Sequence, residues 1–304
     1  MGVGHDHGPG AHDVLVRPGR AFAIGIGLNL AFVAIEAWYG WKSGSLALLA
    51  DAAHNLSDVG GLLLAWGGMV AAGLKPDERH TYGWRRATII ASFANAVILL
   101  VAMGSLAWEA ISRVGDPAPV AGATVMVVAA VGVLINFATA WLFVRGRDDL
   151  NIQGAFLHML ADGLVSAGVV ASGALMLWLG WDWLDPLVSL GIATIVVVGT
   201  WSLFRKSVHL LFDGVPDGLS LPAIQTSLEA IDGVTSVHHV HVWALGTSEN
   251  ALTAHLVLAD GADADHVIAE ANDHLAHEHG IKHATLQVES ARYARGCHGP
   301  EEPG

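Results

Sequence analysis

The chain has 304 residues, of which 53% are hydrophobic and 14% are charged, and its mean hydropathy is +0.49. These values are too apolar for an ordinary soluble domain and indicate a membrane protein with a polar appendix. The formal net charge of −13 argues against a nucleic-acid partner, and the single cysteine, Cys297, rules out an internal disulfide framework.

The N-terminal segment carries His5, His7 and His12 among glycine and aspartate residues. It lacks the basic and apolar regions of a cleavable signal peptide, so we expect a flexible tail at 1–20 and a first membrane helix that acts as its own signal. Two roles stay open for this tail. It either gathers cytosolic metal weakly or is an inert, solvated extension.

Six apolar runs follow, each near the ~20 residues needed to cross a hydrocarbon core of ~30 Å. They lie at roughly 21–41, 46–72, 87–112, 121–144, 152–179 and 184–204. Ten Lys and Arg residues flank these runs on one side of the membrane, whereas the links on the other side hold only Lys42 and Arg113. We therefore expect a six-helix transmembrane domain over 21–211 with both termini in the cytoplasm.

The second and fifth runs contain ionisable residues at helical spacing. Asp51, His54 and Asp58 stand three and then four residues apart, which places them on one helical face. His158 and Asp162 stand four apart in the fifth run. Two imidazoles and two carboxylates from these runs supply the four N/O donors that a tetrahedral, zinc-like ion takes.

The two helices run in opposite directions, so the rise per residue sets the depth of each side chain. His54 and Asp162 should both lie ~14 Å from the outer surface, and Asp58 and His158 both ~20 Å from it. An ionisable side chain at this depth costs at least ~2.5 kcal/mol and usually persists for function. The sequence thus predicts a transport site made of these four residues. Asp51 either orients an imidazole as an outer hydrogen-bond acceptor or acts as a relay on the outward path.

Other polar residues also interrupt the apolar runs. Glu36, in the first run, is a better candidate for an outer vestibule than the asparagines in the other runs. Asn95 and Asn136 are explained equally well by interhelical hydrogen bonds and by a role in transport.

After Leu211 the composition becomes that of a small soluble domain, expected at 212–291, followed by a flexible tail at 292–304. Hydrophobic periodicity predicts an α-β-β-α-β order. The expected elements are helices at 222–231 and 264–279 and strands at 234–243, 251–258 and 285–289. In a regular first strand His239 and His241 share one face and His238 points to the other.

These features resemble the cation diffusion facilitator family, in its zinc-transporting bacterial branch. The resemblance rests on the paired His-x-x-x-Asp motifs, the SGSLALLADAAHNLSD and DERHTYGWRR stretches, and the VHHVHVW strand. It implies six transmembrane helices plus a cytosolic α+β ferredoxin-like domain, as a homodimer in the bacterial cytoplasmic (inner) membrane. It further implies proton-coupled export of divalent zinc, with cadmium as another candidate ion.

The resemblance also implies two further metal sites. His238, His255 and Glu289 would bind Zn²⁺ in the cytosolic domain as a structural or regulatory ion. Asp77 and His80 would form a weak site in the link between the second and third helices.

Acid–base chemistry supports antiport, because zinc needs neutral imidazole and ionised carboxylate and so competes with protons for the same side chains. Two other classes of protein stay open. One is a membrane-anchored metal sensor or scaffold that does not transport. The other is an intramembrane metalloprotease, although the His-Glu-x-x-His string of such enzymes does not occur in the sequence.

Overall fold

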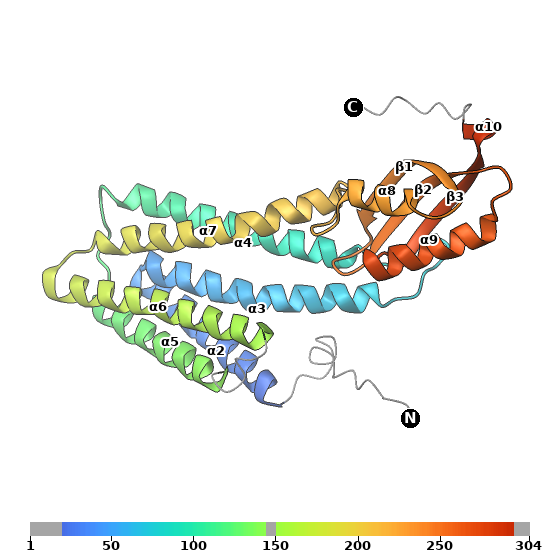
Figure 1. Ribbon diagram of the computed structural model, residues 1–304. Coiled ribbons are helices and arrows are strands. Elements are labelled where there is room, and N and C mark those ends of the chain that lie inside the picture. The colour runs from blue at the N-terminus through green and yellow to red at the C-terminus, as the bar shows by residue number, and fades with distance from the viewer. Residues whose placement is uncertain (1–19, 144–149, 295–304) are drawn as a thin grey trace. The chain divides into compact units, whose positions relative to one another are not determined.

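A computed structural model describes residues 20–143 and 150–294 of the chain (Figure 1). The expected N-terminal tail, except Arg20, lies outside the described residues together with its three histidines. So does the C-terminal segment from residue 295 onward. The short helix α10 (Ala291–Ala294) follows the last strand directly.

Six long helices form the N-terminal two thirds of the chain. They are α2 (Arg20–Ser43), α3 (Leu46–Ala72), α4 (Ala87–Arg113), α5 (Gly122–Phe143), α6 (Leu150–Leu179) and α7 (Leu184–Leu211). Among the described residues, four segments are long and apolar enough to cross a membrane by themselves: Ala87–Arg113, Gly122–Trp141, Met159–Leu179 and Leu184–Leu211. Helix α7 continues past the apolar run expected to end at 204, because backbone hydrogen bonding carries the helix through Arg205 and Lys206.

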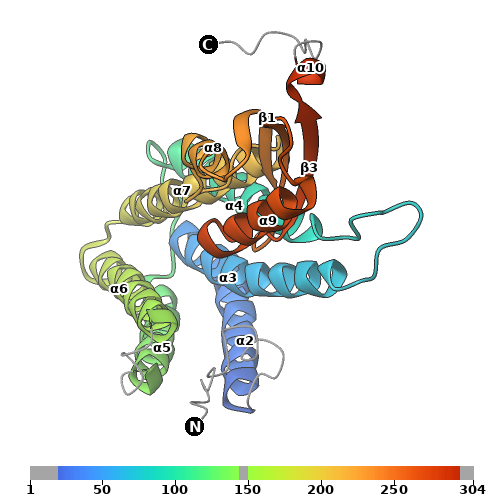
Figure 2. The same ribbon diagram turned by 45° about the vertical axis from the view of Figure 1, so that its right-hand side comes forward.

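The chain divides into two compact units, one formed by residues 1–66 and 94–203 and the other by 67–93 and 204–304. In the first unit α5 and α6 run side by side (Figures 1 and 2). Their backbones touch at two glycines: a Cβ on Gly173 would lie 2.8 Å from the nitrogen of Met126, and one on Gly122 would lie 2.8 Å from the oxygen of Gly173. Small residues at such a contact let membrane helices approach closely.

Helix α3 has its N-terminus capped by a residue from the start of α7. The Asp185 carboxylate accepts hydrogen bonds from the backbone nitrogen of Leu46 at 2.6 Å and that of Ala47 at 3.4 Å. Ser45 adds a cap of its own, since its hydroxyl accepts from the nitrogen of Leu48 at 3.2 Å and donates to Asp185. First-turn N–H groups have no partner within the helix, so these acceptors determine where α3 begins.

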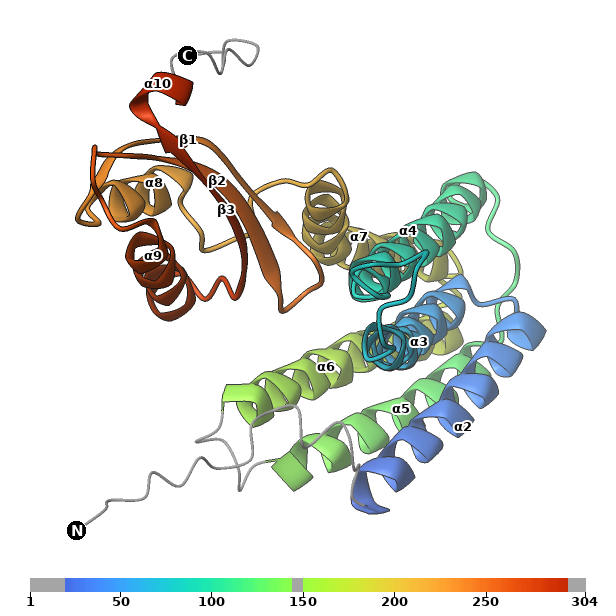
Figure 3. The same ribbon diagram turned by 90° about the vertical axis from the view of Figure 1, so that its right-hand side faces the viewer.

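The second unit contains a three-stranded sheet in the order β1-β2-β3, built from β1 (Val234–Ala244), β2 (Asn250–Leu258) and β3 (His283–Ser290). Strands β1 and β2 are antiparallel, and β2 and β3 are parallel. Helices α8 (Leu221–Glu229) and α9 (Ala264–Glu278) cover one face of this sheet (Figure 3). The α-β-β-α-β order and the expected fold class, six membrane helices plus a ferredoxin-like domain, are confirmed.

The link between α3 and α4 packs against the sheet within the second unit. Tyr82 meets His283, the first residue of β3, with ring centroids 5.3 Å apart. Arg85 forms an ion pair with Glu249, which precedes β2, and Arg86 with Asp213. These contacts attach the link to the soluble domain.

Candidate metal centres

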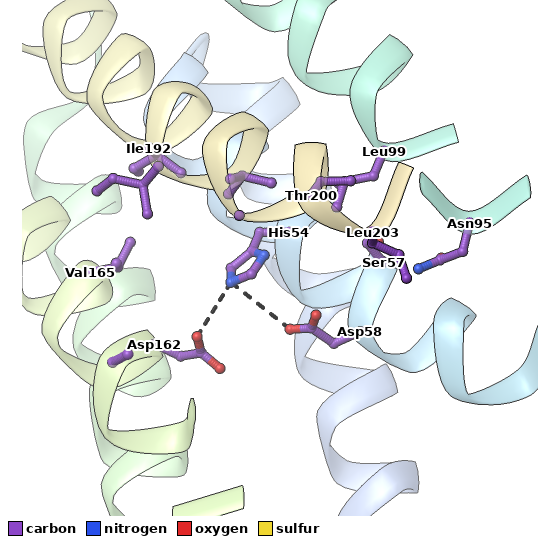
Figure 4. A pocket seen from close by; sticks show the side chains of 14 residues that line it. His54, Ser57, Asp58, Asn95, Leu99, Asp162, Val165, Ile192, Thr200 and Leu203 are labelled. Atoms are coloured by element: carbon purple, nitrogen blue, oxygen red, sulfur yellow. Dashed lines mark hydrogen bonds and ion pairs between the residues drawn. The ribbon is translucent and has the colours of Figure 1, made fainter. Parts of the chain in front are cut away.

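The first candidate centre joins α3 to α6. His54 Nε2 lies 3.3 Å from Asp162 Oδ1 and 3.9 Å from Asp58 Oδ2 (Figure 4). One donor atom from each of the three residues lies within 4.8 Å of the other two, a spacing that a single metal ion can bridge. The neighbours His54 and Asp162 are the pair that helix depth predicts.

These side chains open into a pocket of ≈ 380 Å³ in the first unit. The exposed fraction is 18% for the His54 side chain and 30% for Asp58, against 4% for Asp162. Most of the lining is apolar, with Ser57, Asn95 and Thr200 as further polar residues (Figure 4). An ion in this pocket could therefore be bound by the His54 nitrogen and the two carboxylate oxygens together.

His158, the fourth predicted ligand, lies in α6 one turn before Asp162. Its side chain falls outside the described residues. The spacing of four residues puts both positions on one face of α6.

Behind the centre lies a buried polar cluster. Asp51 and Glu36 are both fully buried, and their carboxyl groups interact. Asp51 Oδ2 accepts a hydrogen bond from Ser166 Oγ at 2.9 Å, and Glu36 Oε2 accepts one from Asn55 Nδ2 at 3.3 Å. The interpretation of Glu36 as a vestibule residue is therefore wrong, because burial removes it from any open entrance.

The second candidate centre lies on the sheet of the second unit. Glu289 has no exposed side-chain surface, and its Oε1 lies 2.7 Å from His255 Nδ1 while its Oε2 lies 3.5 Å from His238 Nε2. Ala254 and Leu256 point into the core under α8 and α9, so the alternation of β2 turns His255 to the opposite face. These three residues also bring one donor atom each within 4.8 Å of the others.

The expectation that His238 and His241 lie on opposite faces of β1 is wrong, because they pair with His255 and Thr253, which are two residues apart in β2 and share one face. The ladder shifts register between His238 and His241, and the His239 ring lies 5.2 Å from that of His238 and 5.1 Å from that of His255, centroid to centroid. A bulge therefore brings His239 beside the second centre.

Asp77 and His80 form a turn in the link. Asp77 Oδ1 accepts from the backbone nitrogens of His80 at 2.6 Å and Arg79 at 2.8 Å, and these donors lower the pKa of the Asp77 carboxyl. His80 stacks near Trp84 with ring centroids 4.2 Å apart. Within 20–143 and 150–294, neither residue belongs to a group of three metal-ligating side chains.

The site residues predicted from the sequence did not include Ser166, Asn55 or His239. Ser166 could have been found, because it stands four residues after Asp162 on the same face of α6. Asn55 and His239 have no such signal: one lies off the His54 face, and the other depends on an irregular strand pairing.

A set of apolar helices with a half-buried imidazole–carboxylate cluster, joined to a ferredoxin-like domain with a second such cluster, defines a multi-pass membrane protein suited to divalent metal ions. Residues 22–212 match the cation efflux transmembrane domain, and residues 216–291 match the cation efflux protein cytoplasmic domain. The chain belongs to the cation efflux family. It is thus a transporter of metal ions and not an enzyme, which rules out the metalloprotease interpretation.

Named relatives cover nearly the whole chain. The zinc transporter ZitB of Escherichia coli is 36% identical over 93% of this chain and 90% of its own. The cadmium, cobalt and zinc/H(+)-K(+) antiporter of Bacillus subtilis is 31% identical over 95% of this chain and 92% of its own. Among solved structures, the metal-bound C-terminal domain of the CzcD transporter from Cupriavidus metallidurans is 32% identical, covers 23% of this chain and 99% of its own, and has a TM-score of 0.23.

Proposed function

We propose that this protein exports Zn²⁺ from the cytoplasm across the bacterial inner membrane in exchange for protons, with Cd²⁺ as a second cargo. The observation that carries the proposal is the convergence of His54, Asp58 and Asp162, from two helices, at one pocket. One relative is named a zinc transporter, and another is named a cadmium, cobalt and zinc/H(+)-K(+) antiporter.

The donor set favours zinc for a chemical reason. With His158 as the fourth ligand, two imidazoles and two carboxylates would surround the ion, and the carboxylates would balance its charge. Magnesium and calcium prefer six or more oxygen donors, so this set discriminates against them.

Proton coupling follows from the same four side chains. A free imidazole has a pKa of ~6.5, so a proton from the outside can displace the ion from its nitrogen ligand. Alternate opening of the pocket to the two sides would then exchange metal for protons. In this scheme Asp51 and Glu36 stabilise the position of α3 through their buried hydrogen bonds to Ser166 and Asn55.

The soluble domain would bind a second Zn²⁺ through His238, His255 and Glu289, in a structural or regulatory role. We also propose a homodimer with both termini in the cytoplasm, and the cytoplasmic-domain family that residues 216–291 match carries the word dimer in its name. Transport would belong to the membrane domain at 21–211 and the second Zn²⁺ site to the ferredoxin-like domain at 212–291, flanked by the tails 1–20 and 292–304. Asp77 and His80 serve the turn of the link in this proposal.

Metal uptake into proteoliposomes tests the transport role. Vesicles with an acidic lumen and a trapped zinc-sensitive dye should take up zinc when they contain the unaltered protein. Asp162→Asn should abolish uptake, because it replaces a charged carboxylate ligand by a neutral amide of similar size. Thr200→Val, which changes a pocket residue that is not a ligand, should stay within ~2-fold of the unaltered rate, as expected for a change that leaves all four donors in place.

The outcome also separates transport from sensing. Zinc binding without uptake would support a membrane-anchored sensor or scaffold. Wild-type uptake by Asp162→Asn would show that the proposed transport site is wrong.

A further inference from the structure

Strand β1 contains one extra residue beside the second centre. His238 pairs with His255 and His241 pairs with Thr253, so three steps along β1 face two steps along β2. His239 is the extra residue, and its φ of 51° lies in the left-handed region. Only Asp213 shares a positive φ among the non-glycine residues of the described part of the chain.

A left-handed histidine inside a strand is strained, because its Cβ crowds the following carbonyl group. Such strain persists where the surrounding structure enforces it, and it concentrates at functional sites. The bulge changes the direction in which the His239 side chain points. In a regular strand the His239 ring would point away from His238, whereas the bulge brings it to 5.2 Å from His238 and 5.1 Å from His255, centroid to centroid.

The centre that His239 approaches has three donors. Glu289 is fully buried and carries the negative charge, and His238 and His255 face it. Structural zinc sites are almost always tetrahedral and closed by four protein ligands. His241 is less suitable as a fourth ligand, because it is exposed and its β2 partner is Thr253, two residues before His255.

We propose that His239 is the fourth ligand of the cytosolic centre and that the β1 bulge exists to deliver it. A rotation of its side chain toward His255 would complete a site of three imidazoles and one carboxylate. This inference rests on the proposed Zn²⁺ site of the soluble domain. It assigns the bulge a function that a three-residue site completed by water would not need.

Glycine substitution separates a ligand from a structural residue. His239→Gly removes the imidazole and also the strain, because glycine adopts positive φ freely. Zinc affinity of the soluble domain should therefore fall ~10-fold or more, while the unfolding temperature of the metal-free protein rises. The matched control is His241→Gly, which should leave zinc affinity unchanged and lower the unfolding temperature, because glycine weakens a regular strand.

The measurements use the full-length protein in detergent, with Asp162→Asn in every variant to weaken the membrane site. Zinc affinity is read by competition with a chelating dye, and geometry by the visible absorption of bound Co²⁺, which is strong in tetrahedral sites and should weaken in His239→Gly. His255→Asn is the control that removes the centre itself.

Three results bear on the proposal. Lost affinity together with a more stable metal-free protein in His239→Gly supports it. Unchanged affinity and unchanged Co²⁺ absorption in His239→Gly, with both lost in His255→Asn, overturns it and leaves the three-residue site standing. If His255→Asn also binds as before, the soluble domain has no site at these residues and both proposals fail.

Discussion

At the scale of single residues, the identity of the donor at position 54 should set which ions the protein accepts. His54→Asp replaces an imidazole by a carboxylate and so makes the set richer in oxygen, which suits harder ions. We expect zinc uptake to require ~10-fold more metal and Mn²⁺ or Mg²⁺ to become effective competitors. Competition of each ion with zinc uptake into proteoliposomes measures this change.

Ser57→Ala provides the control, because Ser57 lines the same pocket beside Asp58 and offers no metal-binding charge. Its competition profile should match that of the unaltered protein. An unchanged profile in His54→Asp would remove His54 from the set of ligands.

Asp77 should act on the link between α3 and α4 through hydrogen bonds. Its pKa lies below the ordinary value because the backbone N–H of His80, and then that of Arg79, donates to the carboxylate. Because the pKa is lower in the folded state, the ionised Asp77 carboxylate stabilises the folded link fully above the unfolded pKa of ~3.9. This stabilisation is lost only as the pH falls through the lower folded pKa. The turn should thus stay ordered down to at least about pH 4.

Two substitutions at this residue distinguish a turn from a metal site. Asp77→Ala removes the acceptor and should speed trypsin cleavage at Arg79 several-fold, whereas Asp77→Asn keeps an acceptor oxygen and should leave cleavage near the unaltered rate. Zinc uptake should be similar in both. An equal loss of zinc affinity in both variants would instead make Asp77 a ligand.

The sequence predicted much of the membrane centre but little of its surroundings. The neighbours His54 and Asp162 followed from helix rise, because depth in a membrane turns sequence position into height. The partners of Asp51 did not, since Ser166 and Asn55 are small polar residues that leave the hydrophobic pattern unchanged. His239 was unpredictable for another reason: a bulge depends on how two strands pair, and one strand's alternation does not contain that information.

At the scale of elements, Asp185 should stabilise the start of α3, the helix that carries His54 and Asp58. Its carboxylate receives two backbone N–H groups of the first turn and also balances the positive end of the helix dipole. Asp185→Ala leaves these donors buried without an acceptor and should lower the free energy of unfolding by about 2 kcal/mol. Unfolding in SDS, followed by helical circular dichroism, measures the loss.

Asp182→Ala is the matched control, because it removes the same charge three residues earlier, at a side chain without a hydrogen bond or ion pair to the described residues. It should change the free energy of unfolding by less than ~0.5 kcal/mol. Equal losses in the two variants would mean that general charge near this end of α7, and not the cap, stabilises α3.

Element boundaries show where periodicity succeeds. The confirmed helices and strands follow from apolar runs that match the thickness of a membrane or the two faces of a sheet. The end of α7 did not follow, because hydropathy falls at Arg205 while the helix continues to Leu211. Nor could periodicity show that Asp185 caps a helix 140 residues away in the chain, since Ser45 and Asp185 meet only after folding.

At the scale of the whole molecule, exchange of zinc for protons fixes how far a pH gradient can concentrate the metal. A difference of one pH unit is worth ~1.36 kcal/mol per proton, so each proton exchanged multiplies the attainable zinc ratio by ~10. In everted membrane vesicles with the membrane potential held at zero, acidifying the lumen by one unit should raise the ratio of free zinc inside to outside ~10-fold for one proton and ~100-fold for two. Free zinc in the lumen, read by a trapped dye at steady state, therefore reports the stoichiometry directly.

Vesicles with Asp162→Asn should show no accumulation under the same gradient. Zinc entry that reaches the same ratio at every lumen pH would mean that the protein conducts metal without exchanging protons, and the antiport proposal would then be wrong.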